Sequence, residues 1–420
     1  MTVYKIALII FLVTLKGVAQ ETKNILFLGN SYTAANNLAQ TLEDVAASTG
    51  NTVIADTNTP GGYTLEGHTT NSVSLEKIKY GNWDFVVLQE QSQRPSLPIA
   101  DVETLVYPFA RKLNDSILTH NPCAETAFYM TWGRENGDAG NCKFWPPVCT
   151  YEGMDDLLRE RYLFMATDNG AITAPVGAVW RYIRDHNLGI NLYSNDGSHP
   201  SIAGTYVAAL TFYTALFRND PTLVTFNSSL STADANSLKE AVKIVVFDNM
   251  SLWNIGAYDP IASFDYNHNG LTYSFTNTST FANQFSWDFG DGTTSNEENP
   301  VHIYNQEGVC NVTLNAGFCD FYTETTQSIA VLLTVDDYSL KNTFTIYPNP
   351  VSDKLYIDSL LNLNESLDFE IYSVLGKKVN FDANSWENRA ISLACLKEGL
   401  YFLVIYADNK VLQTFKFVKK

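Results

Sequence analysis

Short apolar runs alternate with helix-type patterns over residues 20–250 of this chain. The apolar runs are continuous, as in strands buried on both faces, and they lie at Asn24–Leu28, Thr52–Ala55, Phe85–Leu88 and Ala127–Thr131. Helical patterns lie between and after them, for example at Met154–Thr167, Pro175–His186 and Ile202–Phe217. Strands that alternate with helices predict an α/β fold, with a parallel sheet covered by helices on both faces.

The pattern changes near Asp259, where Thr, Ser, Asn, Phe and Tyr become frequent and helix signals become rare. Short alternating runs from there to about Val335 predict a small β-sandwich. A second all-β unit is predicted over about 340–420, after a joint near 336–340. The predicted domains are therefore 20–256, 257–336 and 337–420.

Residues 1–19 have the pattern of a secretory signal peptide. Lys5 precedes the apolar run Ile6–Leu15, and the small residue Ala19 stands at the cleavage position. The run is too short for a comfortable membrane span, and no other stretch approaches the required length. We therefore expect a secreted or cell-surface protein with no membrane span in its mature form.

Composition and charge narrow the function further. The 420 residues are 45% hydrophobic, and the formal net charge is −18. So acidic a chain lacks the basic surface that nucleic acid or an anionic membrane would need.

The six cysteines are compatible with disulfides in a secreted protein. Cys142 and Cys149 can close a Pro-Pro loop, and Cys310 and Cys319 can staple a hairpin. Cys123 and Cys395 are interpreted as free. The chain contains neither Cys-x-x-Cys nor His-Glu-x-x-His, so no metal site is predicted.

The segment Gly29–Thr33 carries the first candidate chemistry. It places Ser31 directly after a predicted strand, at the carboxyl edge of the sheet where α/β proteins bind ligands. Ser31 is either an N-cap in an ordinary loop or a nucleophile beside a helix N-terminus. A base for such a nucleophile is available in His199, because Asp196 lies three residues earlier and can orient the imidazole.

At these residues the chain resembles the SGNH/GDSL hydrolase family. Gly29–Thr33 is similar to the first block of that family, Pro60–Leu65 to the second, and Asp196–Pro200 to the last. The resemblance covers roughly residues 22–220. It implies a flavodoxin-like α/β/α sandwich and esterase activity without metal or organic cofactor, since members include carbohydrate O-deacetylases and lipases.

The resemblance also implies roles for single residues. Ser31 corresponds to the nucleophile, His199 to the general base and Asp196 to its orienting partner. The N–H groups of Ser31 and Gly62 correspond to oxyanion donors.

The chain departs from the family pattern at two places. Asn30 stands where the family usually has Asp, and the Gly-x-Asn-Asp block is missing after Phe85–Leu88. Gln91 is the first candidate to replace the family asparagine as the third oxyanion donor. An alignment of this segment with the family block without gaps would select Gln93 instead.

Other residues near the predicted site have a possible functional role and a possible structural role. Trp132 and Arg134 begin an insertion that is expected to overhang the site, where they either bind a sugar or pack within the loop. Glu90 either tunes the site or is a solvated loop acid, and the second reading is favoured. His68 is expected to be structural.

The C-terminal units resemble known modules. Phe285–Ser295 followed by Asn299–Tyr304 resembles the PKD signature, which implies an Ig-like sandwich that spaces domains or contacts polysaccharide. Phe344–Leu355, Ile371–Lys377 and Leu396–Tyr401 resemble the sorting domain of type IX secretion. The type IX secretion machinery is therefore an expected partner.

Two functions remain open. The leading prediction is a secreted serine esterase that acts on O-acetyl groups of a carbohydrate, with a small ester or acetylated polysaccharide as substrate. The alternative is a non-catalytic protein that binds glycans through an SGNH-like scaffold and the PKD module.

Overall fold

The computed structural model describes residues 20–331, 344–359, 367–374, 376–381, 390–407 and 410–420. The predicted signal peptide and the joint at 336–340 lie outside this range. The described chain divides into two compact units, of which the first contains residues up to Ile261 together with Thr280–Asn283 and Gly317–Thr323. The second unit holds the remaining β-structure.

The first unit is built on a five-stranded sheet in the order β2-β1-β3-β4-β5. Every neighbouring pair is parallel. The strands are β1 (Thr22–Leu28), β2 (Thr52–Asn58), β3 (Phe85–Leu88), β4 (Glu125–Tyr129) and β5 (Ile172–Ala174). This order is that of flavodoxin-like folds, so the predicted fold class is confirmed. It also places the carboxyl ends of β1, β2 and β3 side by side.

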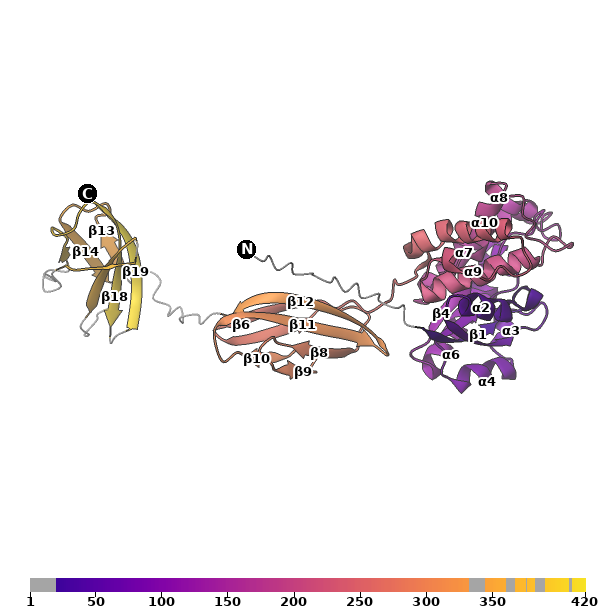
Figure 1. Cartoon of the computed structure of the whole chain (residues 1–420), viewed down its shortest axis with the longest axis horizontal. Helices are drawn as coiled ribbons and strands as arrows, with labels where there is room; N and C mark the ends of the chain where they lie inside the picture. Colours follow the sequence, from indigo (N-terminus) through magenta and orange to yellow (C-terminus); the bar gives the residue numbers. More distant parts are fainter. Residues whose placement is uncertain (1–19, 332–343, 360–366, 375, 382–389, 408–409) are drawn as a thin grey trace, which may run out of the picture. The chain divides into compact units, whose positions relative to one another are not determined.

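Helices cover both faces of this sheet (Figure 1). The α-helices of the unit are α1 (Ser31–Ala34), α2 (Leu38–Ala47), α3 (Leu65–His68), α4 (Ser72–Tyr80), α5 (Ile99–Leu105), α6 (Tyr107–His120), α7 (Tyr151–Asp168), α8 (Val176–Asp185), α9 (Ile202–Phe217) and α10 (Thr232–Val245). On one face α2 packs against α9, and on the other α4 packs against α6. The three helical patterns named from the sequence correspond to α7, α8 and α9.

Helix α9 is apolar around its whole circumference, and every residue from Ala203 to Phe217 is buried. A helix of this kind belongs in the interior and not on the surface. Its start is fixed by the N-cap Ser201, whose Oγ accepts a hydrogen bond from the Gly204 N–H at 3.1 Å. The rigid start of α9 therefore sets the position of the residues directly before it, which include His199.

The second unit contains two antiparallel sandwiches, as predicted. The first has the sheets β10-β7-β6 and β12-β11-β8-β9, built from β6 (Phe264–Asn269), β7 (Thr272–Asn277), β8 (Gln284–Asp288), β9 (Thr294–Ser295), β10 (Val301–Ile303), β11 (Gly308–Phe318) and β12 (Phe321–Val331). The second has the sheets β13-β14-β17 and β16-β15-β18-β19, built from β13 (Phe344–Tyr347), β14 (Lys354–Ser359), β15 (Asp368–Ser373), β16 (Lys378–Val379), β17 (Ala390–Ser392), β18 (Gly399–Ala407) and β19 (Lys410–Lys419).

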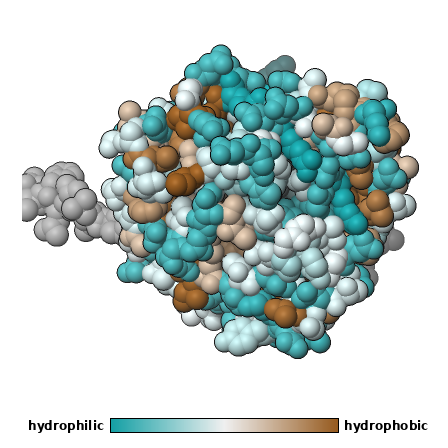
Figure 2. Space-filling model, turned by 90° about the vertical axis from the view of Figure 1, so that its right-hand side faces the viewer, coloured by the Kyte–Doolittle hydropathy of each residue, from teal (hydrophilic) through white to brown (hydrophobic). Residues whose placement is uncertain are grey.

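The face of the first unit in Figure 2 is largely hydrophilic, with apolar residues in small separate groups. Small scattered groups are normal on soluble proteins and do not form a docking surface. Among the described residues, no helix combines the length and the apolar character needed to cross a bilayer.

The disulfides differ in part from the sequence prediction. Cys142–Cys149 forms as predicted, but Cys123 pairs with Cys319, and Cys310 is free. The predicted Cys310–Cys319 disulfide is wrong because Cys310 lies near the start of β11 and Cys319 directly follows its end, so almost the whole extended strand separates them. At about 3.3 Å per residue they are far beyond the Cα separation of about 4–7 Å that a disulfide requires.

Removal of the Cys123–Cys319 bridge is expected to destabilise the first unit by about 2–5 kcal/mol, because the bridge closes a long loop in the unfolded chain. The two cysteines are 196 residues apart. The measurement is the unfolding midpoint of the double variant Cys123→Ser/Cys319→Ser in the full chain. Cys395→Ser is the matched control, because Cys395 is exposed and unbridged. Equal midpoints for the two variants would contradict this expectation.

Candidate active site

The turn Gly29-Asn30-Ser31 follows β1 at the carboxyl edge of the sheet, and Ser31 begins α1. Gly29 is required by space, because a Cβ there would lie 2.4 Å from Thr33 Oγ1 and 2.7 Å from Gln89 Oε1. Asn30 is extended and caps α1 by accepting from the Tyr32 N–H. The N-cap is thus Asn30, which leaves the Ser31 hydroxyl free for another partner.

Ser31, His199 and Asp196 form one hydrogen-bonded row, although Ser31 precedes the other two by more than 160 residues. Ser31 Oγ lies 2.8 Å from His199 Nε2. His199 Nδ1 lies 2.6 Å from Asp196 Oδ2. The structure therefore brings together the three residues that the sequence singled out.

The hydrogen bonds of Asp196 fix its charge and the tautomer of His199. Burial acts to raise the pKa of Asp196, but hydrogen bonds from the His199 ring, Ser194 Oγ and the N–H groups of Ser198 and His199 outweigh it, and the pKa lies well below its usual range. An ionised carboxylate can only accept, so Nδ1 carries the proton and Nε2 presents its lone pair to Ser31. This arrangement can take a proton from the Ser31 hydroxyl.

The N–H groups of Ser31 and Gly62 have no acceptor among the described residues. Gly62 lies in the loop after β2 with φ of +71°, a conformation that favours glycine. It is exposed, and a Cβ there would meet nothing within 4 Å. Both predicted oxyanion donors are thus free to bind a ligand oxygen.

Gln91 and Gln93 hydrogen-bond each other. Gln91 Oε1 accepts from the N–H groups of Gln93 and Arg94, and its Nε2 donates to Gln93 Oε1 at 3.1 Å. Gln93 Nε2 donates to Asp138 Oδ2 at 2.7 Å. Each amide keeps one N–H without an acceptor among the described residues, so both remain candidates for the third donor.

Gln89 and Glu90 were not assigned a structural role from the sequence, and both are fully buried. Gln89 Oε1 accepts from Asn30 N and Thr33 Oγ1, at 2.9 Å each. Glu90 Oε2 accepts from Leu65 N at 3.2 Å. The interpretation of Glu90 as a solvated loop acid is therefore wrong. A signal was present in the sequence, because both residues directly follow the central strand β3.

Burial raises the pKa of Glu90 to about 8, against smaller opposing effects of the Gln91 N–H and the Arg94 charge. An acid with a raised pKa stabilises the fold below its unfolded pKa of about 4, and this contribution is lost as the pH rises through 8.

His68 is also buried. Its ring nitrogens lie within hydrogen-bond distance of Gly29 O and Ser74 Oγ, which agrees with the structural role expected from the sequence.

Trp132 supports the loop that carries Ser198 and His199 and offers no surface to a sugar. Its ring stacks on Tyr32 at 5.0 Å and on Trp180 at 3.8 Å, and its exposed fraction is 0%. Its Nε1–H donates to Ser198 O at 3.0 Å. Of the two roles considered for Trp132, packing within the loop is confirmed and sugar binding is excluded, because Tyr32 and Trp180 stack on the ring and it is fully buried.

The insertion that begins at Trp132 contacts both sides of the site. Asp138 is buried and accepts from Gln93, while Arg134 lies 3.5 Å from its other oxygen. At the opposite end, Glu135 N donates to Gly197 O at 2.9 Å. Arg134 remains partly exposed, so its guanidinium is still available to a ligand.

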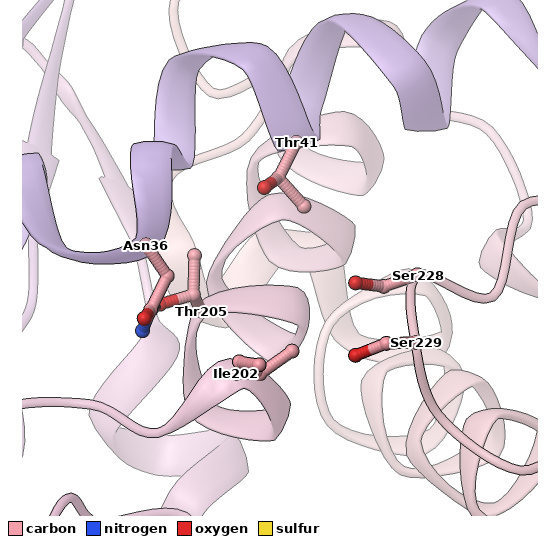
Figure 3. A pocket seen from close by; sticks show the side chains of 6 residues that line it. All are labelled: Asn36, Thr41, Ile202, Thr205, Ser228 and Ser229. Atoms are coloured by element: carbon pink, nitrogen blue, oxygen red, sulfur yellow. Dashed lines mark hydrogen bonds between the residues drawn. The ribbon is translucent and has the colours of Figure 1, made fainter.

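A pocket of about 300 Å³ lies near the segment that precedes α9 (Figure 3). It is lined by Asn36, Thr41, Ile202, Thr205, Ser228 and Ser229. None of these side chains is charged. Asn36 Nδ2 donates to Pro200 O at 3.0 Å, so the pocket lies next to the segment that carries His199.

Family models match the two C-terminal sandwiches. Residues 262–331 match the model of the PKD domain, and residues 345–420 match that of the secretion system C-terminal sorting domain. The chain carries these two domains. The sorting domain indicates secretion or location at the cell surface. No curated protein matches the chain.

Three solved structures resemble the part of the chain that precedes the PKD domain. A candidate SGNH hydrolase from Slackia heliotrinireducens is 28% identical, with a TM-score of 0.38 over 46% of this chain and 97% of that chain. A DUF4886 family protein from Bacteroides uniformis is 18% identical, with a TM-score of 0.46 over 54% and 96%. The lipase/acylhydrolase from Enterococcus faecalis is 16% identical, with a TM-score of 0.34 over 47% and 98%.

Proposed function

We propose that the chain is a secreted serine esterase that hydrolyses carboxylic esters through an acyl-enzyme. The observation that carries this proposal is the row Ser31–His199–Asp196 beside two free backbone N–H groups. A serine with a purely structural role has no need of a histidine that is itself oriented by an ionised carboxylate. The geometry supports an esterase better than a non-catalytic glycan-binding protein.

In this mechanism Ser31 Oγ attacks the ester carbonyl while His199 Nε2 takes its proton. Asp196 stabilises the imidazolium that forms. The N–H groups of Ser31 and Gly62 hold the oxyanion of the tetrahedral intermediate, and each such donor contributes about 3–4 kcal/mol. His199 then protonates the leaving alcohol, and water, activated by the same imidazole, releases the acid.

The proposed substrate is an O-acetyl group on a carbohydrate. The pocket beside Pro200 is lined by hydroxyl and amide groups together with Ile202 and carries no charge, which suits a neutral sugar. Arg134, which lies beside Asp138 and is partly exposed, is the proposed cation for a sugar hydroxyl or carboxylate. The sorting domain is proposed to deliver the enzyme through the type IX secretion machinery.

The test is labelling of the full chain by a serine-directed fluorophosphonate. We expect a single adduct on Ser31, because among the described residues the other serine that contacts a histidine, Ser74 beside His68, is fully buried. Peptide mass mapping locates the adduct, and the His199→Ala variant is expected to lose it. Absence of labelling in the folded wild type, or equal labelling of His199→Ala, would contradict the esterase proposal.

A further inference from the structure

Asn30 joins the turn that carries Ser31 to the loop that carries Gly62. Its Nδ2 donates to Tyr63 O at 2.9 Å, and Tyr63 directly follows Gly62. Its Oδ1 accepts from Tyr32 N at 3.1 Å. Only 2% of the residue is exposed. One buried side chain thus links the two segments that carry the proposed oxyanion donors.

This link needs a side chain that both donates and accepts, as an amide does. The Tyr63 carbonyl can only accept, and the Tyr32 N–H can only donate, so the side chain between them must do both. An ionised carboxylate only accepts, so aspartate at this position could keep the Tyr32 contact but not the Tyr63 contact. It would also place a negative charge beside a carbonyl oxygen in a buried site.

Gln89 and Glu90 hydrogen-bond the same two segments, the turn that carries Ser31 and the loop that carries Gly62. Gln89 Oε1 accepts from Asn30 N at 2.9 Å, which fixes the backbone of the nucleophile turn. Glu90 Oε2 accepts from Leu65 N at 3.2 Å, three residues after Gly62. On the other side of Gly62, the Asn58 carbonyl accepts from Gly29 N at 3.2 Å. The loop is therefore anchored on both sides of Gly62.

Gly62 itself has no support of its own, since it is exposed and nothing lies near its Cβ position. The position of its N–H is consequently set by the anchors on either side. We propose that Asn30 is a positioning residue whose side-chain amide fixes the Gly62 N–H relative to the Ser31 N–H, with Gln89 and Glu90 holding the two segments in place. This proposal rests on the esterase function proposed above.

The first test is the kinetics of Asn30→Asp with p-nitrophenyl acetate. We expect kcat to fall about 10- to 100-fold, because one oxyanion donor is displaced while the Ser31–His199 pair is kept. KM is expected to stay within about twofold. Asn37→Asp is the matched control, since Asn37 is exposed and its side chain makes no capping hydrogen bond. A kcat of Asn30→Asp within twofold of wild type would overturn the proposal.

The second test is the pH dependence of the same variant. A protonated carboxyl at position 30 can again donate to the Tyr63 carbonyl. The ratio of variant to wild-type kcat is therefore expected to rise as the pH falls from 8 towards 5. A ratio that does not change with pH would mean that the substitution acts only through a general structural defect, and it would overturn the role of the amide.

Hydrogen exchange separates this proposal from the esterase proposal. In Asn30→Asp, the amides of residues 63–65 are expected to exchange faster than in wild type and in Asn37→Asp. Wild type without esterase activity would refute the proposed function, whereas faster exchange would still support the positioning role. Unchanged exchange would overturn it.

Glu90→Gln is a second variant if Asn30→Asp does not fold. The glutamine oxygen can serve only one of the two N–H groups that the Glu90 carboxyl now binds, those of Leu65 and Gln91. Faster exchange at residues 63–65 and a lower kcat are again expected. A wild-type exchange rate and kcat in this variant would overturn the proposal.

Discussion

Replacement of Ser31 by alanine is expected to lower kcat for p-nitrophenyl acetate by about 10⁴- to 10⁶-fold. The variant loses the only hydroxyl within hydrogen-bond reach of His199 Nε2 among the described residues. The oxyanion donors and the binding surface remain, so a small residual rate above that of water is expected. The acyl-enzyme, visible in the wild type as a mass increase during turnover, should be absent.

Ser72→Ala is the matched control for this variant, since Ser72 is exposed on the same unit and no described residue bonds its hydroxyl. It should keep wild-type kcat. Both variants should share the wild-type unfolding midpoint, because neither serine fills a buried cavity. Ser31→Ala with more than a tenth of wild-type activity would refute the assignment of the nucleophile.

The fold of the first unit could be predicted because its signals are local. Strands buried on both faces appear as continuous apolar runs, and Phe85–Leu88 matches β3 in both bounds. Ile202–Phe217 likewise matches α9. Strand β5, Ile172–Ala174, was not predicted, because three residues are too few for a pattern.

The candidate site could be predicted where single residues follow strand ends or precede helix starts. Ser31 and His199 occupy such places, so their spacing in the sequence reflects their place in the fold. The surroundings of Trp132 could not be predicted, because its neighbour Tyr32 is 100 residues away. Burial of Glu90 was missed although the residue follows the central strand, since carboxylates are usually exposed, and its acceptor role depends on the distant Leu65 N–H.

The cysteine pairing shows the same limit. Cys142 and Cys149 are close in sequence, and their bridge was predicted. The partner of Cys123 is Cys319, at the tip of the β11–β12 hairpin of the PKD domain. This tip, Gly317–Thr323, belongs to the first compact unit. Pairing of this kind is decided by tertiary structure and leaves no local pattern.

Replacement of Asp196 by asparagine is expected to lower kcat about 10³- to 10⁴-fold. Asp196 Oδ1 accepts from three donors, Ser194 Oγ at 2.7 Å and the N–H groups of Ser198 and His199 at 3.0 and 2.9 Å. An amide oxygen is therefore drawn to this position, and the amide nitrogen is turned towards His199 Nδ1.

The introduced amide then donates to Nδ1, which must give up its proton. The proton moves to Nε2, so the imidazole faces Ser31 with a donor and can no longer accept the hydroxyl proton. Loss of the carboxylate also removes the charge that stabilises the imidazolium. The defect should appear in kcat, with KM nearly unchanged, because no contact to bound ester is altered.

Two variants control for this result. Ser194→Ala removes one of the donors to Asp196 but leaves the carboxylate, and its kcat should stay within about fivefold of wild type. Asp115→Asn makes the same chemical change at an exposed residue of α6 and should have no effect. If Asp196→Asn retained more than a tenth of wild-type kcat, His199 would be oriented by its neighbours Tyr32 and Ser198 alone, and Asp196 would have no catalytic role.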